Sequence, residues 1–328
     1  MMTSRTSCTS RHTYVCRQLA AALVASALGA SAYAETATGV ALDKDFNASE
    51  KAAVMVTTSA GAAPVLKGLQ RAAITSFQVE FVTKGAAGAS SYEIGRSGSA
   101  STNLQITMVG LDKADFQAIT DKLYDGFVSD LQQMQIEVVP VERVLAAPAY
   151  QRLAATGSAS PVDTRTRDTW STVYAPQGLA VYGTGSTSTA IPVFGAFAQF
   201  ANIGTALTGT FDLQKELDAA LLEVRMVVHF VDMQSSGINK MFGNNAVASV
   251  NWKFGPSVAA TSTKMTVHRP TGTASMTLRA PLLVDGAAFK EVRDTTSIAA
   301  NVGLAFLSAA IGKGGSATAV EKEAVADP

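Results

Sequence analysis

The chain has few cysteines and few charged residues. The scarcity of cysteine excludes proteins that depend on disulfide bonds or on a catalytic thiol. Only two of its 328 residues are cysteines, Cys8 and Cys16, and both lie before Ala34. If this leader is removed, the remaining chain contains no thiol, which excludes disulfide bonds and thiol catalysis. Only 16% of the residues are charged.

The segment from Met1 to Ala34 has the pattern of an export signal. Arg5, Arg11 and Arg17 form a basic region, the apolar stretch Leu19 to Ala34 follows, and it closes on Ala32-Tyr33-Ala34. This pattern predicts a Sec-type signal peptide cleaved after Ala34. The alternative, a membrane anchor, is disfavoured because the apolar part is short and no second apolar helix follows. We therefore expect a periplasmic or secreted protein, with outer-membrane association as a further option.

The charge balance disfavours nucleic acid as a partner. The whole chain has 26 basic and 26 acidic residues. Removing the leader removes three arginines and no acid, so 23 basic residues face 26 acidic ones. A protein that binds nucleic acid needs a basic surface, so we expect no nucleic-acid partner. Glu35 occupies the position where a lipoprotein would carry a cysteine.

Motifs that carry chemistry are also missing. The sequence has no HExxH, no CxxC, no calcium-binding EF-hand loop and no Gly-x-Ser-x-Gly, so we predict no metal, no cofactor and no catalytic residue. Gly183-Thr184-Gly185-Ser186 is the nearest approach to a phosphate loop, but no Lys-Ser/Thr pair follows it. Only His229 and His268 remain after the leader, and we interpret His229 as a structural histidine.

Apolar periodicity predicts an α/β layer between about Leu69 and Leu153. In Arg71–Thr83 the apolar face consists of Phe77, Val79, Phe81 and Thr83. The next elements are a mobile loop over Lys84–Ser101, a strand over Leu104–Leu111, a helix over Asp112–Gln135, a strand over Ile136–Glu142 and a short helix that breaks before Pro148. The helix has Asp112 as its cap and one apolar stripe of Phe116, Ile119, Leu123, Phe127, Leu131 and Met134.

The C-terminal half is predicted to be rich in strands. The expected strands are Leu221–Met233, Ala248–Phe254, Lys264–His268 and Ala274–Val284, with turns at Ser235–Gly237 and Gly255-Pro256. Helical spacing follows over Thr296–Ile311, and the tail from Gly312 is expected to be disordered.

These elements predict an α+β or α/β fold: a mixed sheet with packed helices in a β-β-α-β-α opening, a β-rich C-terminal half and a C-terminal helix. The predicted division of the chain is a signal peptide at 1–34, a flexible N-terminal arm at 35–68, an α/β envelope domain at 69–311 and a disordered tail at 312–328. A sub-boundary is possible near 154–168.

One long segment carries no charge at all. Thr169 to Phe211 contains no Asp, Glu, Lys or Arg, and its second half holds Ile191, Phe194, Phe197, Phe200 and Phe211. Three interpretations stay open: a buried or partner-covered segment, a membrane-interacting hairpin or amphipathic element, or a mobile loop. These five residues are our candidate interaction or membrane segment.

Several segments resemble the curli production assembly/transport family of bacterial envelope proteins. The similar stretches are RAAITSFQVEFV, then FVSDLQQMQIEVVPVERVLAAPAYQRL at the end of the long helix, and later LLEVRMVVHFVDMQSSG. The resemblance covers patches between Leu69 and Gly243. It implies a periplasmic α/β domain that oligomerises and, in the best-known members, inserts β-hairpins into the outer membrane as a secretion channel.

We therefore expect an exported, non-enzymatic envelope protein that acts through protein–protein contacts, with a protein partner or further copies of itself. Such a protein would serve secretion or surface assembly. One alternative is a membrane-inserting pore or secretion-channel component, which would use Ile191–Phe211. A second alternative is a secreted hydrolase whose active site is assembled from scattered residues.

Overall fold

The computed structural model describes residues 40–42, 48–94, 99–165, 169–182, 208–238, 240–241, 247–260, 262–284, 289–294 and 315–326. The predicted signal peptide and the predicted helix over Thr296–Ile311 lie outside these residues. In its described part the chain is a mixed α/β protein with one large mixed sheet, and most of its regular structure is strand.

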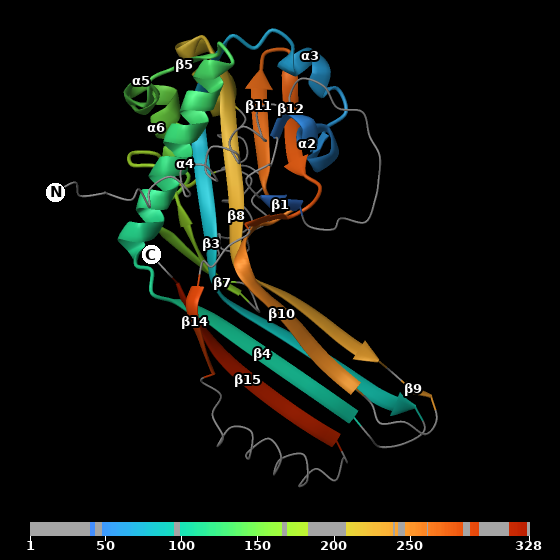
Figure 1. Cartoon of the computed structure of the whole chain (residues 1–328). Helices are drawn as coiled ribbons and strands as arrows, with labels where there is room; N and C mark the ends of the chain where they lie inside the picture. Colours follow the sequence, from blue (N-terminus) through green and yellow to red (C-terminus); the bar gives the residue numbers. More distant parts are fainter. Residues whose placement is uncertain are drawn as a thin grey trace, which may run out of the picture.

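Two unusually long strands run through the whole sheet (Figure 1). β3 (Arg71–Ile94) has 24 residues and β8 (Ala220–Ile238) has 19, against about 5–6 in an average strand. They pair in parallel from Ala72 and Ala220 down to Val82 and His229. These two strands therefore connect the top of the molecule to its lower end.

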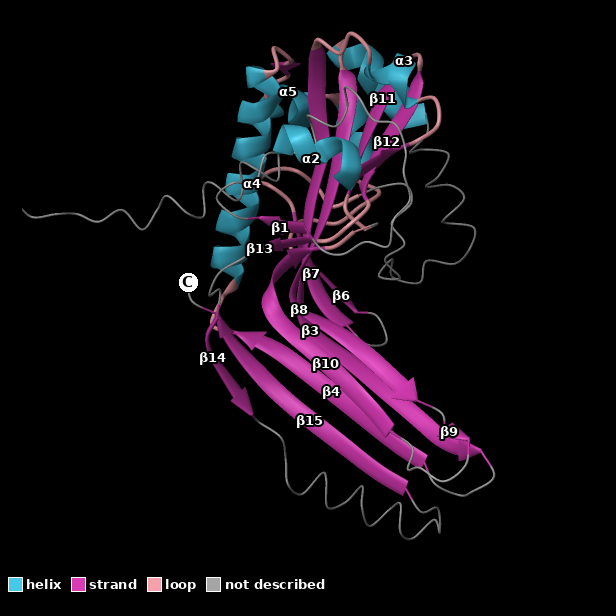
Figure 2. Ribbon diagram, turned by 45° about the vertical axis from the view of Figure 1, so that its right-hand side comes forward, coloured by secondary structure: helices cyan, strands magenta, loops and turns pink. Residues whose placement is uncertain are grey.

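The neighbours of both strands change at one level, which we call the waist. Above it, β3 pairs with β7 (Thr169–Tyr174) and β8 pairs with β11 (Lys264–Arg269). Below it, β3 pairs with β4 (Ser99–Val109) and β8 pairs with β10 (Val247–Val258). The waist comprises residues 82–85 of β3 and 228–230 of β8. Above it lies an α/β core, and below it strands extend away without a covering helix among the described elements (Figures 1 and 2).

One face of the core is covered by α4 (Lys113–Gln133), α5 (Val141–Ala146) and α6 (Pro148–Ala154) (Figure 1). The buried face of β3 meets α4 through aromatic rings: Phe77 lies 5.5 Å from Tyr124 and Phe81 lies 4.7 Å from Phe116, measured between ring centroids. The apolar face predicted for β3 is confirmed at Phe77, Val79 and Phe81, all buried. On α4, the stripe is buried at Phe116, Leu123, Phe127 and Leu131.

The predicted cap of this helix is also confirmed. Asp112 accepts hydrogen bonds from the backbone N–H groups of Ala114 and Asp115, and Asp115 accepts one from the N–H of Asp112. Both side chains satisfy N–H groups that the first helical turn leaves without partners.

The remaining described elements are two short helices and the other strands of the sheet. Their bounds are β1 (Val40–Leu42), α2 (Ala48–Met55), β2 (Val56–Thr58), α3 (Ala62–Leu66), β5 (Glu137–Val138), β6 (Val162–Arg165), β9 (Lys240–Met241), β12 (Gly272–Leu278), β13 (Leu282–Val284), β14 (Phe289–Asp294) and β15 (Gly315–Ala326). Residues 208–217 are also helical.

Two predictions about flexible ends are wrong. The expected arm at 35–68 includes α2, β2 and α3, and Met55, Val56 and Val65 are buried in the core. β2 pairs with β12, which gives this segment a sheet partner far away in the sequence. The expected disordered tail forms β15, which runs parallel to β4 from Gly315 to Val325.

Three predicted loops and turns are strands instead. The mobile loop expected over Lys84–Ser101 is the lower half of β3 and the start of β4, and the turn expected at Ser235–Gly237 lies inside β8. Gly255-Pro256 interrupts β10 only as a register shift between Phe254 and Ser257. Proline has no N–H for a ladder, so it is tolerated at such a bulge. The strand expected over Ile136–Glu142 is shorter, because Pro140 precedes the first turn of α5.

Candidate functional site

Several strands below the waist are long. β4 has 11 residues and β10 and β15 have 12 each. β3 and β8 continue below the waist to Ile94 and Ile238, which is nine residues of β3 (86–94) and eight of β8 (231–238). A tilted strand needs about 9–11 residues to span the hydrocarbon core of a bilayer, so β3, β4, β10 and β15 are long enough and β8 is one residue shorter. We call this set the hairpin region.

Polar and apolar residues alternate along the β8–β10 hairpin. Val231 lies opposite Phe254, Met233 opposite Trp252, and Ser235 opposite Val250. The intervening pairs are Asp232–Lys253, Gln234–Asn251 and Ser236–Ser249. Opposed residues of an antiparallel pair share a face of the sheet. The register therefore places Val231, Met233, Val250, Trp252 and Phe254 on one face, and charged or polar residues on the other.

β4 repeats this alternation with Leu104, Ile106 and Met108 between Asn103, Gln105 and Thr107. Leu104, Ile106 and Met108 are all buried. Their partners on β3 include Gly85 and Ala87, which have little or no side chain. β10 lies close to both β3 and β4, so the two hairpins run down from the core together (Figures 1 and 2).

The two edges of the hairpin region differ. The outer edge of β4 is paired with β15 along its full length, and β15 in turn pairs with β14. Apart from β8, the described strands offer β10 a partner only at Ser257 and Val258, which pair with β13. Over Val247–Phe254 this edge therefore has no strand partner within the described part of the chain. Such an edge is a template for the addition of a strand from another chain.

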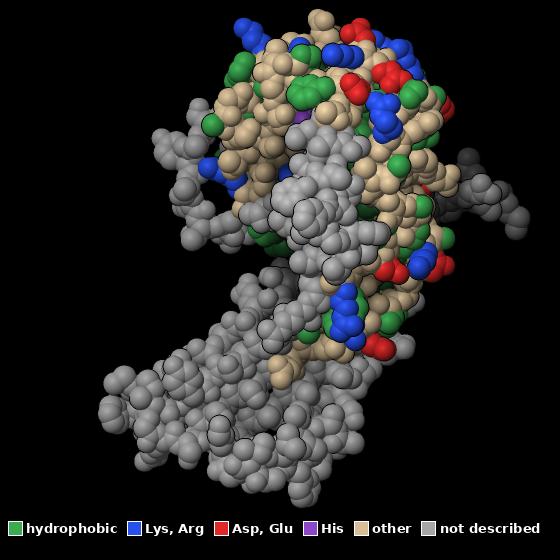
Figure 3. Space-filling view, turned by 180° about the vertical axis from the view of Figure 1, so that it is seen from behind, with side chains coloured by type: hydrophobic (Ala, Val, Ile, Leu, Met, Phe, Trp, Pro, Cys, Tyr) green, Lys and Arg blue, Asp and Glu red, His purple; other side chains and the backbone are tan. Residues whose placement is uncertain are grey.

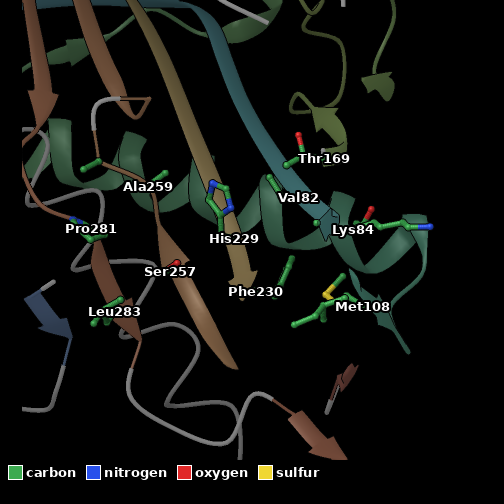
Figure 4. A pocket seen from close by; sticks show the side chains of 14 residues that line it. Val82, Lys84, Met108, Thr169, His229, Phe230, Ser257, Ala259, Pro281 and Leu283 are labelled. Atoms are coloured by element: carbon green, nitrogen blue, oxygen red, sulfur yellow. The ribbon is translucent and has the colours of Figure 1, made fainter. Parts of the chain in front are cut away.

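A cavity of about 360 Å³ opens at the waist, where the central strands leave the core (Figure 4). Its wall is mainly apolar, with Val82, Met108, Phe230 and Leu283 among the lining residues. Ser257 and His229 face each other in the ladder and both line this cavity. Among the described residues no Asp or Glu lines it, so this lining lacks the carboxylate that orients the imidazole in a serine-hydrolase triad.

A polar network joins the central strands just above the waist, on the face opposite α4. Arg225 Nη2 donates to Glu80 Oε2 at 2.7 Å, and Ser171 Oγ donates to Glu80 Oε1 at 2.6 Å. Thr164 and Ser171 share a hydrogen bond of 2.7 Å. This network links β6, β7, β3 and β8, so it is a structural tie across four strands.

Most of the segment predicted as the interaction site lies outside the described residues. This applies to Ile191, Phe194, Phe197 and Phe200. Phe211 is described: it lies in helix 208–217 and its side chain is 57% exposed, whereas Leu213 and Leu217 are buried. Whether Ile191–Phe211 is core, interface or membrane element stays a prediction.

The sequence alone does not identify the hairpin region as a site, although a signal for it exists. Runs of strict alternation occur at Asn103–Met108 and at Ser249–Phe254. Each run predicts a strand, but the pairing that aligns the two faces along the whole hairpin follows only from the registers of the long strands.

Neither a metal site nor a helix that could span a membrane occurs among the described residues. Among the described residues no group of three or more His, Cys, Asp or Glu could hold a metal ion. None of the described helices combines the length and apolar character that crossing a membrane requires. Comparison of the chain with protein-family models, with curated proteins and with solved structures found no match.

Proposed function

We propose that this chain is an exported, non-enzymatic envelope protein that works by contact, and that its hairpin region enters a lipid bilayer when copies of the chain assemble. The observation that carries this proposal is the β8–β10 ladder over Val231–Ser236 and Ser249–Phe254, in which one face is apolar apart from Ser235 and the other is polar or charged. The export pattern of residues 1–34 and the resemblance to an envelope family support it.

A sheet with one apolar face must cover that face with protein or with lipid, because exposed apolar area is unfavourable in water. Within one chain, β10 lies against β3 and β4, and Leu104, Ile106 and Met108 of β4 are buried. Insertion would replace these contacts between hairpins with lipid on the apolar face. Within each hairpin the facing backbone groups would stay paired, and the outer groups of β10 over Val247–Phe254 would need a strand from a neighbouring copy, because unpaired backbone groups are unfavourable in lipid.

Assembly is the second part of the proposal. The edge of β10 over Val247–Phe254 accepts a strand from a neighbouring copy. β15 covers the other edge through its pairing with β4. Protein–protein contact through these edges is also the function that remains if the hairpins never meet lipid.

Flotation with vesicles tests the membrane step. The chain is exported from a Gram-negative host, purified in detergent and mixed with phosphatidylcholine vesicles. We expect the wild type to float with the vesicles and Val250→Arg to remain at the bottom. Val250 lies on the apolar face in the middle of the Val247–Phe254 ladder, and an arginine on a lipid-facing position near the bilayer midplane costs about 2–4 kcal/mol. Asn251→Arg adds the same charge on the opposite face and is the matched control, which should float.

Three outcomes would change the conclusion. A wild type that stays at the bottom overturns the membrane step. Equal loss of flotation in Val250→Arg and Asn251→Arg overturns the assignment of the apolar face. Loss in Phe197→Asp, together with normal flotation of Val250→Arg, transfers the role to Ile191–Phe211.

A further inference from the structure

A tryptophan lies between two cations at the waist, across three adjacent strands. Trp170 on β7 pairs with Lys84 on β3 and with Arg165 on β6. Lys84 Nζ lies 4.6 Å from the centroid of the Trp170 ring, and Arg165 Cζ lies 4.6 Å from it. These three residues form the waist triad.

The strand geometry explains why the three side chains meet. The pairing of β3 with β7 shifts register between Val82 and Lys84, so Lys84 comes to lie opposite Trp170. Residues directly opposed on neighbouring strands are close enough for long side chains to interact. A cation near the face of an indole is attracted by the ring's quadrupole, which holds both basic groups beside Trp170.

The triad marks the lower margin of the core. Lys84 and Gly85 of β3 pair with β7 on one edge and with β4 on the other, and of these two pairings only the one with β4 continues below them. Figure 3 shows Lys or Arg side chains, with Asp or Glu side chains beside them, at the lower margin of the coloured surface. On β6, Arg165 is the last residue toward the hairpins, and Asp163 lies nearer the core, where it accepts a hydrogen bond from Thr172 Oγ1 at 2.8 Å. Within the described part of β6, the basic group therefore lies nearer the hairpins than this carboxylate.

Among the described residues, no Asp or Glu forms an ion pair with Lys84 or Arg165. Trp170 is half-buried and Arg165 is exposed. The triad therefore offers an amphipathic ring and two positive charges at the level where the hairpin region begins.

We propose that the waist triad binds the phosphates of anionic lipid headgroups and sets the depth to which the hairpins enter the bilayer. This inference rests on the proposed function. Tryptophan concentrates at the membrane–water interface because its ring is apolar and its N–H is polar. Lys and Arg beside it attract an anionic surface, and each is worth about a fivefold change in binding.

Vesicles of two compositions test the inference: phosphatidylcholine alone, and phosphatidylcholine with phosphatidylglycerol. We expect the wild-type full chain to bind the anionic vesicles more tightly. The double variant Lys84→Gln, Arg165→Gln should lose about 25-fold on the anionic vesicles and keep its binding to phosphatidylcholine. The double variant Lys67→Gln, Arg143→Gln removes the same charge at the far end of the core and should retain the preference.

Depth is measured separately with Trp170 as the probe. The chain has two tryptophans, Trp170 and Trp252, so Trp252→Phe leaves Trp170 as the sole source of tryptophan fluorescence. Lipids brominated near the headgroup should quench it more strongly than lipids brominated near the chain ends. Inorganic phosphate should neither quench Trp170 nor displace the chain from anionic vesicles.

The outcomes separate the inference from the function on which it rests. Absence of binding to either vesicle means that the proposed function has failed. Equal wild-type binding to both compositions, or a preference that survives in Lys84→Gln, Arg165→Gln, overturns the inference alone. Displacement by inorganic phosphate also overturns it, since the site would then be one for a free anion.

Discussion

Arg225 on β8 donates a hydrogen bond of 2.7 Å to the carboxylate of Glu80 on β3, and the side chains are only 18% and 12% exposed. This pair ties together the two strands that run from the core into the hairpin region. A slip of one residue between paired strands moves every side chain to the opposite face. The Glu80–Arg225 pair therefore helps to fix which residues of both hairpins occupy the apolar face.

Loss of one partner from this pair is expected to be costly. In Arg225→Met the carboxylate of Glu80 stays nearly buried without its cation, so the free energy of unfolding should fall by about 3 kcal/mol. Arg152 and Asp212 form a comparable pair at 3.0 Å, but both are about half exposed, and Arg152→Met should cost less than about 1 kcal/mol. Urea unfolding of the two variants measures this difference. Equal losses would show that the buried pair has no special role.

Alkaline conditions should destabilise the fold through buried tyrosines. Burial raises the pKa of Tyr124 from 10.0 to about 12, with smaller contributions from the nearby charges of Asp125 and Glu142. The pKa of Tyr182 is also raised, chiefly by burial. A raised pKa means that the folded state holds the phenol proton more tightly, so this stabilisation is complete below pH 10 and is lost as the pH rises through the folded value.

We expect urea midpoints to fall between pH 10 and about 12, and the fall to be smaller in Tyr124→Phe. Unfolding curves across this pH range, compared with phenolate absorbance of the folded protein, test the effect. The same pH dependence in Tyr124→Phe and wild type would contradict it.

Two glycines should respond to alanine in opposite directions. Gly126 lies inside α4, and a Cβ built there would meet no atom within 4 Å, so Gly126→Ala should stabilise by about 0.5–1 kcal/mol through reduced backbone entropy. At Gly157 a Cβ would meet the backbone carbonyl of Val181 and lie 2.7 Å from Tyr182 Cβ. Gly157→Ala should therefore lower the thermal midpoint, and a rise in both variants would contradict the packing around Val181.

The C-terminal strand should control self-association. Truncation before Gly315 removes β15 and leaves the edge of β4 over Ser99–Val109 without its partner. An exposed edge strand pairs readily with other chains, so light scattering should show larger assemblies than for the full chain. A truncated chain of unchanged size would mean that β15 does not protect this edge.

Periodicity predicts those elements of the core in which apolar residues recur on one side of a helix or strand. The stripe on α4 and the apolar face of β3 are visible in the sequence because each repeats with the period of its element. The lower half of β3 is not predicted, since Gly85, Ala86, Ala87 and Gly88 have low strand propensity and are held by pairing with β4. The same reason applies to β15, whose parallel partner β4 lies far earlier in the chain.

The candidate site shows the same limit. The sequence draws attention to Ile191–Phe211 because uncharged runs of that length are conspicuous, yet the hairpin region contains charged residues such as Asp232 and Lys253. Only the register shows that these two lie opposite each other and share the polar face. A strand with polar or charged residues at every second position has a low mean hydropathy, although one of its faces is apolar.

The most direct test of the central claim is a cysteine scan along β10. Cys8 and Cys16 are the only cysteines, so Cys8→Ser and Cys16→Ser give a background without thiols for single cysteines at residues 249 to 254, each labelled with a polarity-sensitive fluorophore. When vesicles are added, we expect a blue shift at Val250, Trp252 and Phe254 and little change at Ser249, Asn251 and Lys253. Equal shifts at all six positions, or none at any, would contradict it.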